Sequence, residues 1–188
     1  SNICTATALM ASMVGFYAVY HGPEGLRRIA QHIYSHTCAV ADALKAMGYT
    51  LVSENYFDTL EVEAEVAVVQ QLSLERGINF FYPTRSSVRM SFDEVTTADE
   101  VRTVVEIFAL AKGCKAPKNI KIDEKRAFSV PELVRTSDIL TEPVFNKYRS
   151  ENDMMRYIKK LEMRDISMAN SMISLGSCTM KLNSAASM

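Results

Sequence analysis

The first 48 residues show helical periodicity with one interruption. Residues 3–20 are apolar on nearly all sides, a pattern typical of a helix covered by other structure. Gly22 and Pro23 break this pattern, and proline suits the first turn of a following helix. Apolar residues three and four positions apart then predict a second helix, which Gly48 ends as a left-handed cap.

A period of two follows and predicts β-strands. After a first short strand from Tyr49, residues 58–65 alternate so that apolar side chains and the three glutamates Glu61, Glu63 and Glu65 lie on opposite faces. The next elements expected are a helix over 66–76, strands over 78–82 and 88–92 around a turn at 83–87, a helix from the capping box Thr97–Glu100 to Gly113, and a helix from Ser150.

The order of these elements predicts an α+β fold, with helices packed on a small, mainly antiparallel sheet and an extended helical tail. Residues 114–149 carry three of the five prolines and only short apolar clusters, as a connecting segment does. The expected regions are two helices over 1–48, an α+β core over 49–113, a connection with a late helix over 114–165, and a last segment over 166–188. We expect 114–188 to be loosely attached.

Composition excludes several classes of protein. Hydrophobic residues make up 48% of the 188 residues and charged residues 23%, with a formal net charge of -1, which argues against a disordered chain and against a nucleic-acid binder. The longest apolar run contains Ser12 and Gly15 and is too short to span a bilayer. The four cysteines are far apart, which favours free thiols in a reducing compartment. We therefore expect a soluble cytoplasmic protein without a membrane contact.

Two groups of residues resemble catalytic or metal sites. His32 and His36 lie four positions apart on a predicted helix and could share a metal ion. No acidic residue occupies the position that a zinc-protease motif requires, so partly exposed helix histidines without a metal are favoured. The glutamates of residues 61–65 are interpreted as a solvated strand face, because nothing in the sequence buries them.

Residues 175–181 combine small residues with hydroxyls, the thiol of Cys178 and the ammonium of Lys181. Such a turn could hold a nucleophile or bind an anion, or it could be a tight structural turn. The sequence shows neither a Walker motif nor a base that would activate the thiol. The residues alone leave these alternatives open.

Three late segments carry a family resemblance: 140–148 (LTEPVFNKY), 157–162 (YIKKLE) and 171–183 (SMISLGSCTMKLN). They closely resemble the P-protein of the glycine cleavage system, and residues 1–6, 20–26 and 78–80 resemble earlier parts of the same family. One departure is Ser174, where the family pattern has proline. The resemblance runs along the whole chain and is strongest in the last 20 or so residues.

The resemblance implies a fragment of a decarboxylating glycine dehydrogenase. It would span the end of the first half, a small domain of the aspartate-aminotransferase-like (fold type I) class, and the start of the second half. In this family pyridoxal phosphate supplies the chemistry for decarboxylation, and the aminomethyl group passes to the lipoyl arm of H-protein. The lysine that holds the cofactor belongs to a later part, so no catalytic or cofactor-binding residue and no bound cofactor are expected here.

The resemblance also implies partners and a site margin. Ser177, Cys178, Thr179 and, more weakly, Lys181 would lie near the active-site margin of the complete enzyme, although packing of the two halves explains the motif equally well. The partners expected are the remaining P-protein domains and H-protein, in the cytoplasm or, in a eukaryote, the mitochondrial matrix. The alternative function is a stand-alone α+β interaction module.

The apolar N-terminal helix also predicts how the isolated chain behaves. If its covering domain belongs to another part of the protein, then Leu9, Met13, Phe16 or Tyr17 would be exposed to water. Several such side chains would favour self-association. We therefore expect a homo-oligomer with this helix at the contact.

Overall fold

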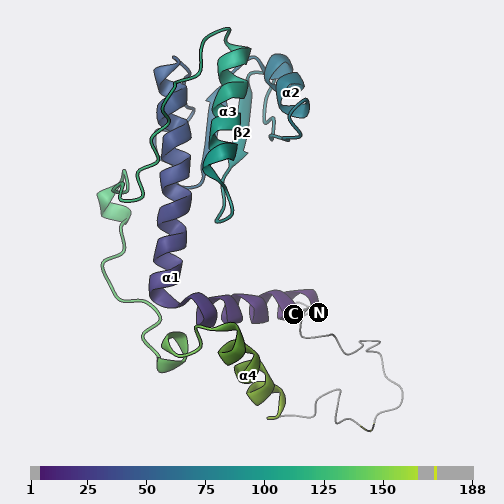
Figure 1. The fold of residues 1–188 in the computed structure, drawn as a ribbon, viewed down its shortest axis with the longest axis vertical. Coiled ribbons are helices and arrows are strands. Elements are labelled where there is room, and N and C mark those ends of the chain that lie inside the picture. Colours follow the sequence, from purple (N-terminus) through teal and green to yellow (C-terminus); the bar gives the residue numbers. More distant parts are fainter. Residues whose placement is uncertain (1–4, 165–171, 173–188) are drawn as a thin grey trace. The chain divides into compact units, whose positions relative to one another are not determined.

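The computed structural model describes residues 5–164 and residue 172 and divides the chain into two units (Figure 1). Unit 1 comprises Ser1–Pro23 and Asp138–Met188, and unit 2 comprises Glu24–Ser137. The helices and strands are α1 (Thr5–Ala46), β1 (Thr59–Glu63), α2 (Val66–Leu74), β2 (Ser87–Ser91), α3 (Ala98–Ala111) and α4 (Glu151–Glu162), with 3-10 turns η1 (Pro131–Leu133) and η2 (Pro143–Asn146).

Helix α1 contains the interruption that its sequence predicts. Gly22 has φ 60° and ψ -174°, outside the helical region, so α1 is two helices joined at a kink. This combination of angles is accessible essentially only to glycine. The second part ends as expected at Gly48, whose φ of 78° is left-handed.

The sheet of unit 2 has one buried and one exposed face. Strands β1 and β2 pair antiparallel, with Leu60 opposite Met90 and Val62 opposite Val88. These four side chains are buried. On the other face Glu61 accepts hydrogen bonds from Arg89, with a shortest N–O distance of 2.6 Å, which confirms that the alternation separates core from surface.

Two of the four segments predicted to be strands do not form strands in the structure. Residues 78–82 make only one bridge, between Phe81 and Arg89, and the segment after Tyr49 makes only one, between Leu51 and Val62. Gly77, with φ 69°, and Pro83 flank the first segment. Proline has no N–H to donate, so Pro83 cannot continue the pairing beyond Tyr82.

One hydrophobic core holds unit 2 together. It joins the buried residues among 39–44 of α1, the inner face of the two strands, Val69 of α2 and one face of α3. The upper part of Figure 1 shows the ribbons of these elements. The capping box that begins α3 forms as predicted, because the Thr97 side chain accepts from the Glu100 N–H while the Glu100 carboxylate accepts from the Thr97 N–H. Unit 2 is therefore an α+β domain whose helices cover one face of a two-stranded sheet.

Residues 116–129 correct the expectation of a loosely attached connection. Ala116, Ile120 and Ile122 pack against the core. Further along, the Gln31 side chain donates to the carbonyl of Arg126 at 2.9 Å, and the N–H of Ser129 donates to a tyrosine hydroxyl of α1 at 2.9 Å. The segment lacks helices and strands, but two side chains of α1 form hydrogen bonds with its backbone.

Unit 1 packs the first part of α1 with η2 and α4. Phe16 contacts Tyr157 edge-on at a ring distance of 6.4 Å, and Tyr157 stacks on Tyr148 at 4.2 Å. The Arg149 guanidinium donates to the carbonyls of Val19 and Tyr20 at 3.0 and 3.2 Å. The cap of α4 by Ser150 is confirmed, since its side chain accepts from the N–H of Asp153.

The N-terminal part of α1 is not covered all round in unit 1. Phe16 is half-buried, contrary to the expectation that it is exposed, because it packs against α4. Six apolar or aromatic side chains of this part of α1 are exposed: Leu9, Met10, Met13, Val14, Tyr17 and Tyr20. No helix among the described residues is both long enough and apolar enough to cross a membrane.

Candidate functional site

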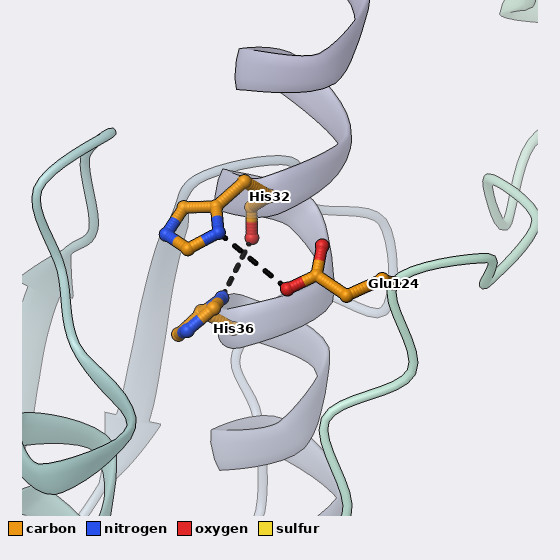
Figure 2. A group of neighbouring side chains, drawn as sticks. All are labelled: His32, His36 and Glu124. Carbon is orange, nitrogen blue, oxygen red and sulfur yellow. Dashed lines mark hydrogen bonds and ion pairs between the residues drawn. The ribbon is translucent and has the colours of Figure 1, made fainter.

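The most concentrated group of potential ligand side chains in the described residues lies in unit 2 and joins α1 to the segment after α3 (Figure 2). It consists of His32 and His36 of α1 and Glu124 of the docked segment. The helical spacing of four places the two histidines on one face, and their rings lie 4.0 Å apart between centroids, tilted by 42°.

Main-chain carbonyls hold both imidazole rings. His32 Nε2 donates to the carbonyl of Thr96 at 3.1 Å, and His36 Nδ1 donates to the carbonyl of His32 at 2.9 Å. The first contact comes from the loop before α3 and the second from the helix itself. A neutral His32 that keeps its proton on Nε2 has its lone pair on Nδ1.

The free nitrogen of His32 faces Glu124. His32 Nδ1 lies 3.5 Å from Glu124 Oε1, and Figure 2 shows the carboxylate directed toward both rings. His36 is 3% exposed, whereas the side chains of His32 and Glu124 are 34% and 57% exposed. The group therefore has a fixed, buried member and two members that can reach solvent.

Neighbouring contacts fix the segment that carries Glu124. Arg126 forms an ion pair with Asp42 of α1, and hydrogen bonding to this carboxylate raises the pKa of the Arg126 guanidinium. Phe128 packs against Tyr34 at a ring distance of 4.9 Å. These contacts hold Glu124 near α1 without any element of secondary structure.

The sequence identified two members of this group and missed the third. The spacing of His32 and His36 is compatible with a shared metal ion, but the sequence has no acidic residue at the position that a zinc-protease motif requires. In the structure Glu124 supplies a carboxylate from a distant segment. No signal in the sequence pairs residues 120–128 with α1. His36 is also buried rather than partly exposed, and the loop before α3 contacts the neighbouring His32 through the Thr96 carbonyl.

The residues expected at an active-site margin are not among those that the structure describes. Ser177, Cys178, Thr179 and Lys181 fall outside the described residues. Two cysteines can be described, and both are free: Cys38 is buried and Cys114 is exposed. Glu61, Glu63 and Glu65 do not form a catalytic group, since Glu63 and Glu65 are exposed and Glu61 pairs with Arg89; hydrogen bonds from Arg89 lower the pKa of Glu61.

The fold is that of a small α+β domain joined to helical segments, and comparison with known proteins specifies its family. A family model described as glycine cleavage system P-protein matches residues 1–108. The chain therefore belongs to the glycine cleavage system P-protein family.

Relatives match over the whole chain. Proteins named glycine dehydrogenase (decarboxylating) from Christiangramia forsetii, Bacteroides thetaiotaomicron and Shewanella pealeana are 45%, 47% and 46% identical to it. In each case the match covers 100% of this chain and 20% of the relative. The chain thus spans about a fifth of the length of these relatives.

Proposed function

We propose that this chain is a non-catalytic part of a decarboxylating glycine dehydrogenase, supplying a small α+β domain and the connection to the catalytic half. The observation that carries the proposal is the match along the entire chain to about a fifth of proteins that bear this name. The α+β domain of unit 2 fits a small domain of the fold type I class, with residues 166–188 as the opening of the catalytic half.

The proposal assigns no pyridoxal phosphate site to the described residues. A lysine that holds this cofactor needs an enclosed pocket, because desolvation makes its amine nucleophilic. Every lysine within residues 5–164 is exposed. Under this proposal the lysine that holds the cofactor belongs to another part of the complete enzyme, and no chemical step is assigned to the described residues.

Partners follow from the same proposal. The remaining P-protein domains cover surfaces of this chain, and lipoylated H-protein receives the aminomethyl group from the complete enzyme, in the cytoplasm of a bacterial cell. Ser177, Cys178, Thr179 and Lys181 line the margin of the active site, where hydroxyl, thiol and ammonium groups can bind polar ligands.

The exposed side chains of α1 support a covering domain. The six residues 9, 10, 13, 14, 17 and 20 fall within about 140° of the helix circumference, and the first four are 54–67% exposed. Four-fifths of the length of the relatives lies outside the match, which leaves ample protein to cover this stripe. In the isolated chain, a second copy takes that place and produces a homo-oligomer.

The proposal is tested by assaying the purified chain with pyridoxal phosphate and glycine. We expect no exchange of labelled bicarbonate into the carboxyl carbon of glycine, because the cofactor-holding lysine is absent from the chain. A purified relative such as the Bacteroides thetaiotaomicron protein serves as the positive control. Exchange by the 188-residue chain itself would refute a non-catalytic role.

A stand-alone interaction module is the alternative function. It predicts that the chain, produced alone, is a stable monomer with a partner outside the P-protein. The match to the relatives over residues 1–188 favours the first proposal, since an unrelated module has no reason to follow the family outside the α+β domain.

A further inference from the structure

We propose that His32, His36 and Glu124 form a binding site for a divalent transition-metal ion, of which Zn²⁺ is the best match. One ligand atom from each residue lies within 4.8 Å of the other two. Figure 2 shows the three side chains converging from α1 and from the segment after α3. Residues far apart in the sequence thus bring two imidazoles and one carboxylate to one point.

The donor set selects the class of metal. Imidazole nitrogen together with a carboxylate oxygen suits Zn²⁺, Co²⁺, Ni²⁺ and Cu²⁺, whereas Ca²⁺ and Mg²⁺ prefer oxygen ligands alone. Three protein ligands leave at least one coordination position of a tetrahedral ion open to water or to an external ligand.

The surroundings of His32 are those of a metal ligand. A metal-binding histidine almost always donates its second N–H to a carbonyl or carboxylate, which fixes the ring and the tautomer. Here Nε2 donates to the Thr96 carbonyl at 3.1 Å, and Nδ1, 3.5 Å from Glu124 Oε1, is the nitrogen that faces the other ligands. The loop before α3 therefore orients His32 for binding through Nδ1.

His36 provides the fixed side of the site. It is 3% exposed, and its Nδ1 donates to the carbonyl of His32 at 2.9 Å. The ring can bind a metal through Nε2 and keep this bond, or through Nδ1 after a change of tautomer that moves the proton to Nε2. Either choice leaves the helix backbone in place.

Metal binding requires a small contraction. Bonds of about 2.0–2.2 Å to a tetrahedral ion place neighbouring ligand atoms about 3.3–3.6 Å apart, so atoms that now lie within 4.8 Å of one another must approach by at most about 1.5 Å. Glu124 is 57% exposed, so its side chain has room to move toward the two rings while His32 keeps its hydrogen bond to Thr96. The metal would then tie residues 116–129 to α1, beside the ion pair of Arg126 with Asp42.

The test titrates the EDTA-treated 188-residue chain with ZnCl₂ by isothermal calorimetry, with the thermal midpoint as a second readout. We expect one site and a rise of the midpoint on metal addition, because an ion that binds only the folded chain stabilises it. His32→Gln and Glu124→Gln should each weaken binding by at least about tenfold. These two residues are partly exposed, so both variants should fold; a His36 variant is avoided because it is buried.

Matched controls separate this site from other ligands. His21 is the remaining histidine and packs between Tyr17 and Tyr20, and Glu132 is an exposed acid in the same connecting segment. His21→Gln and Glu132→Gln should bind Zn²⁺ as the parent does. Co²⁺ should give a visible spectrum without the intense near-ultraviolet band of thiolate ligands.

Three results would overturn the proposal. They are absence of Zn²⁺ binding, equal affinity in the parent and in both His32→Gln and Glu124→Gln, and a thiolate band with Co²⁺, which would place the metal at cysteines. None of these results depends on decarboxylase activity. The experiment therefore tests the metal site independently of the proposed function.

Discussion

At the residue scale, Tyr49 connects the end of α1 with α3. Its hydroxyl donates a 2.7 Å hydrogen bond to the carbonyl of Phe108, and its ring meets the Phe108 ring edge-on at 5.3 Å. Lys112 Nζ lies 4.4 Å from the Tyr49 ring centroid and donates to the carbonyl of Gly48 at 2.5 Å. One side chain thus ties two core helices together through a polar group.

Replacing Tyr49 with phenylalanine should lower the free energy of unfolding by about 1 kcal/mol, the typical net value of one hydrogen bond. Burial raises the pKa of Tyr49 from 10.0 to about 12, so the neutral hydroxyl stabilises the fold fully below pH 10. This contribution is lost as the pH rises from 10 to 12. Urea unfolding at neutral and alkaline pH should show the parent–variant difference shrinking over that window; a constant difference would contradict this assignment.

The residue scale also explains which parts of the candidate site were predictable. His32 and His36 are visible in the sequence because helical spacing alone places them together. The position of Glu124 beside these histidines could not be predicted, because it depends on contacts of Arg126 and Phe128 in a segment without regular structure. Irregular backbone has no periodicity, so a sequence pattern cannot locate it.

At the element scale, the elements with local signals were predicted well. Helix α3 has a capping box at Thr97 and an apolar stripe, and α4 has a cap at Ser150. Each of these signals depends only on residues within one or two turns. The prediction of a strand over 78–82 is wrong. This segment pairs only through Phe81 and Arg89, and such pairing depends on tertiary contacts that a local pattern does not contain.

The kink in α1 gives a prediction at this scale. Gly22→Ala should destabilise unit 1 by about 1–3 kcal/mol, because φ 60° with ψ -174° is strained for any residue with a Cβ. An added Cβ would also collide with the Arg149 guanidinium. The loss should appear as a lower midpoint of thermal unfolding followed by circular dichroism.

Gly15 provides the matched control for this kink. It lies in the same helix with helical backbone angles and has open space around it. Gly15→Ala should therefore stabilise the helix by about 0.5–1 kcal/mol. If both alanine variants changed the midpoint equally, the backbone conformation of Gly22 would not be the cause.

At the scale of the whole molecule, the exposed stripe of α1 predicts self-association of the isolated chain. Burying each large apolar side chain is worth about 1.5–3 kcal/mol, and Leu9 and Met13 are 60% and 54% exposed. The double substitution Leu9→Glu with Met13→Glu should therefore shift sedimentation velocity profiles from oligomer to monomer. Ala11→Glu, at an exposed position outside the stripe, should leave the oligomer intact.

A monomeric parent chain at high concentration would contradict this prediction. It would show either that other parts of the same chain cover the exposed apolar side chains of α1, or that these side chains stay in contact with water without causing association. Dye binding to exposed apolar surface distinguishes these two cases, because a covered helix binds no dye whereas an exposed one does.

The central claim is that these 188 residues form a working part of a glycine cleavage system P-protein. The most direct measurement is the exchange of labelled bicarbonate with the carboxyl carbon of glycine, catalysed by a chimera. In this chimera the chain replaces the matching fifth of the Christiangramia forsetii protein, to which it is 45% identical. We expect the chimera to fold, bind pyridoxal phosphate and retain exchange activity. A folded chimera that binds the cofactor but does not exchange bicarbonate would contradict it.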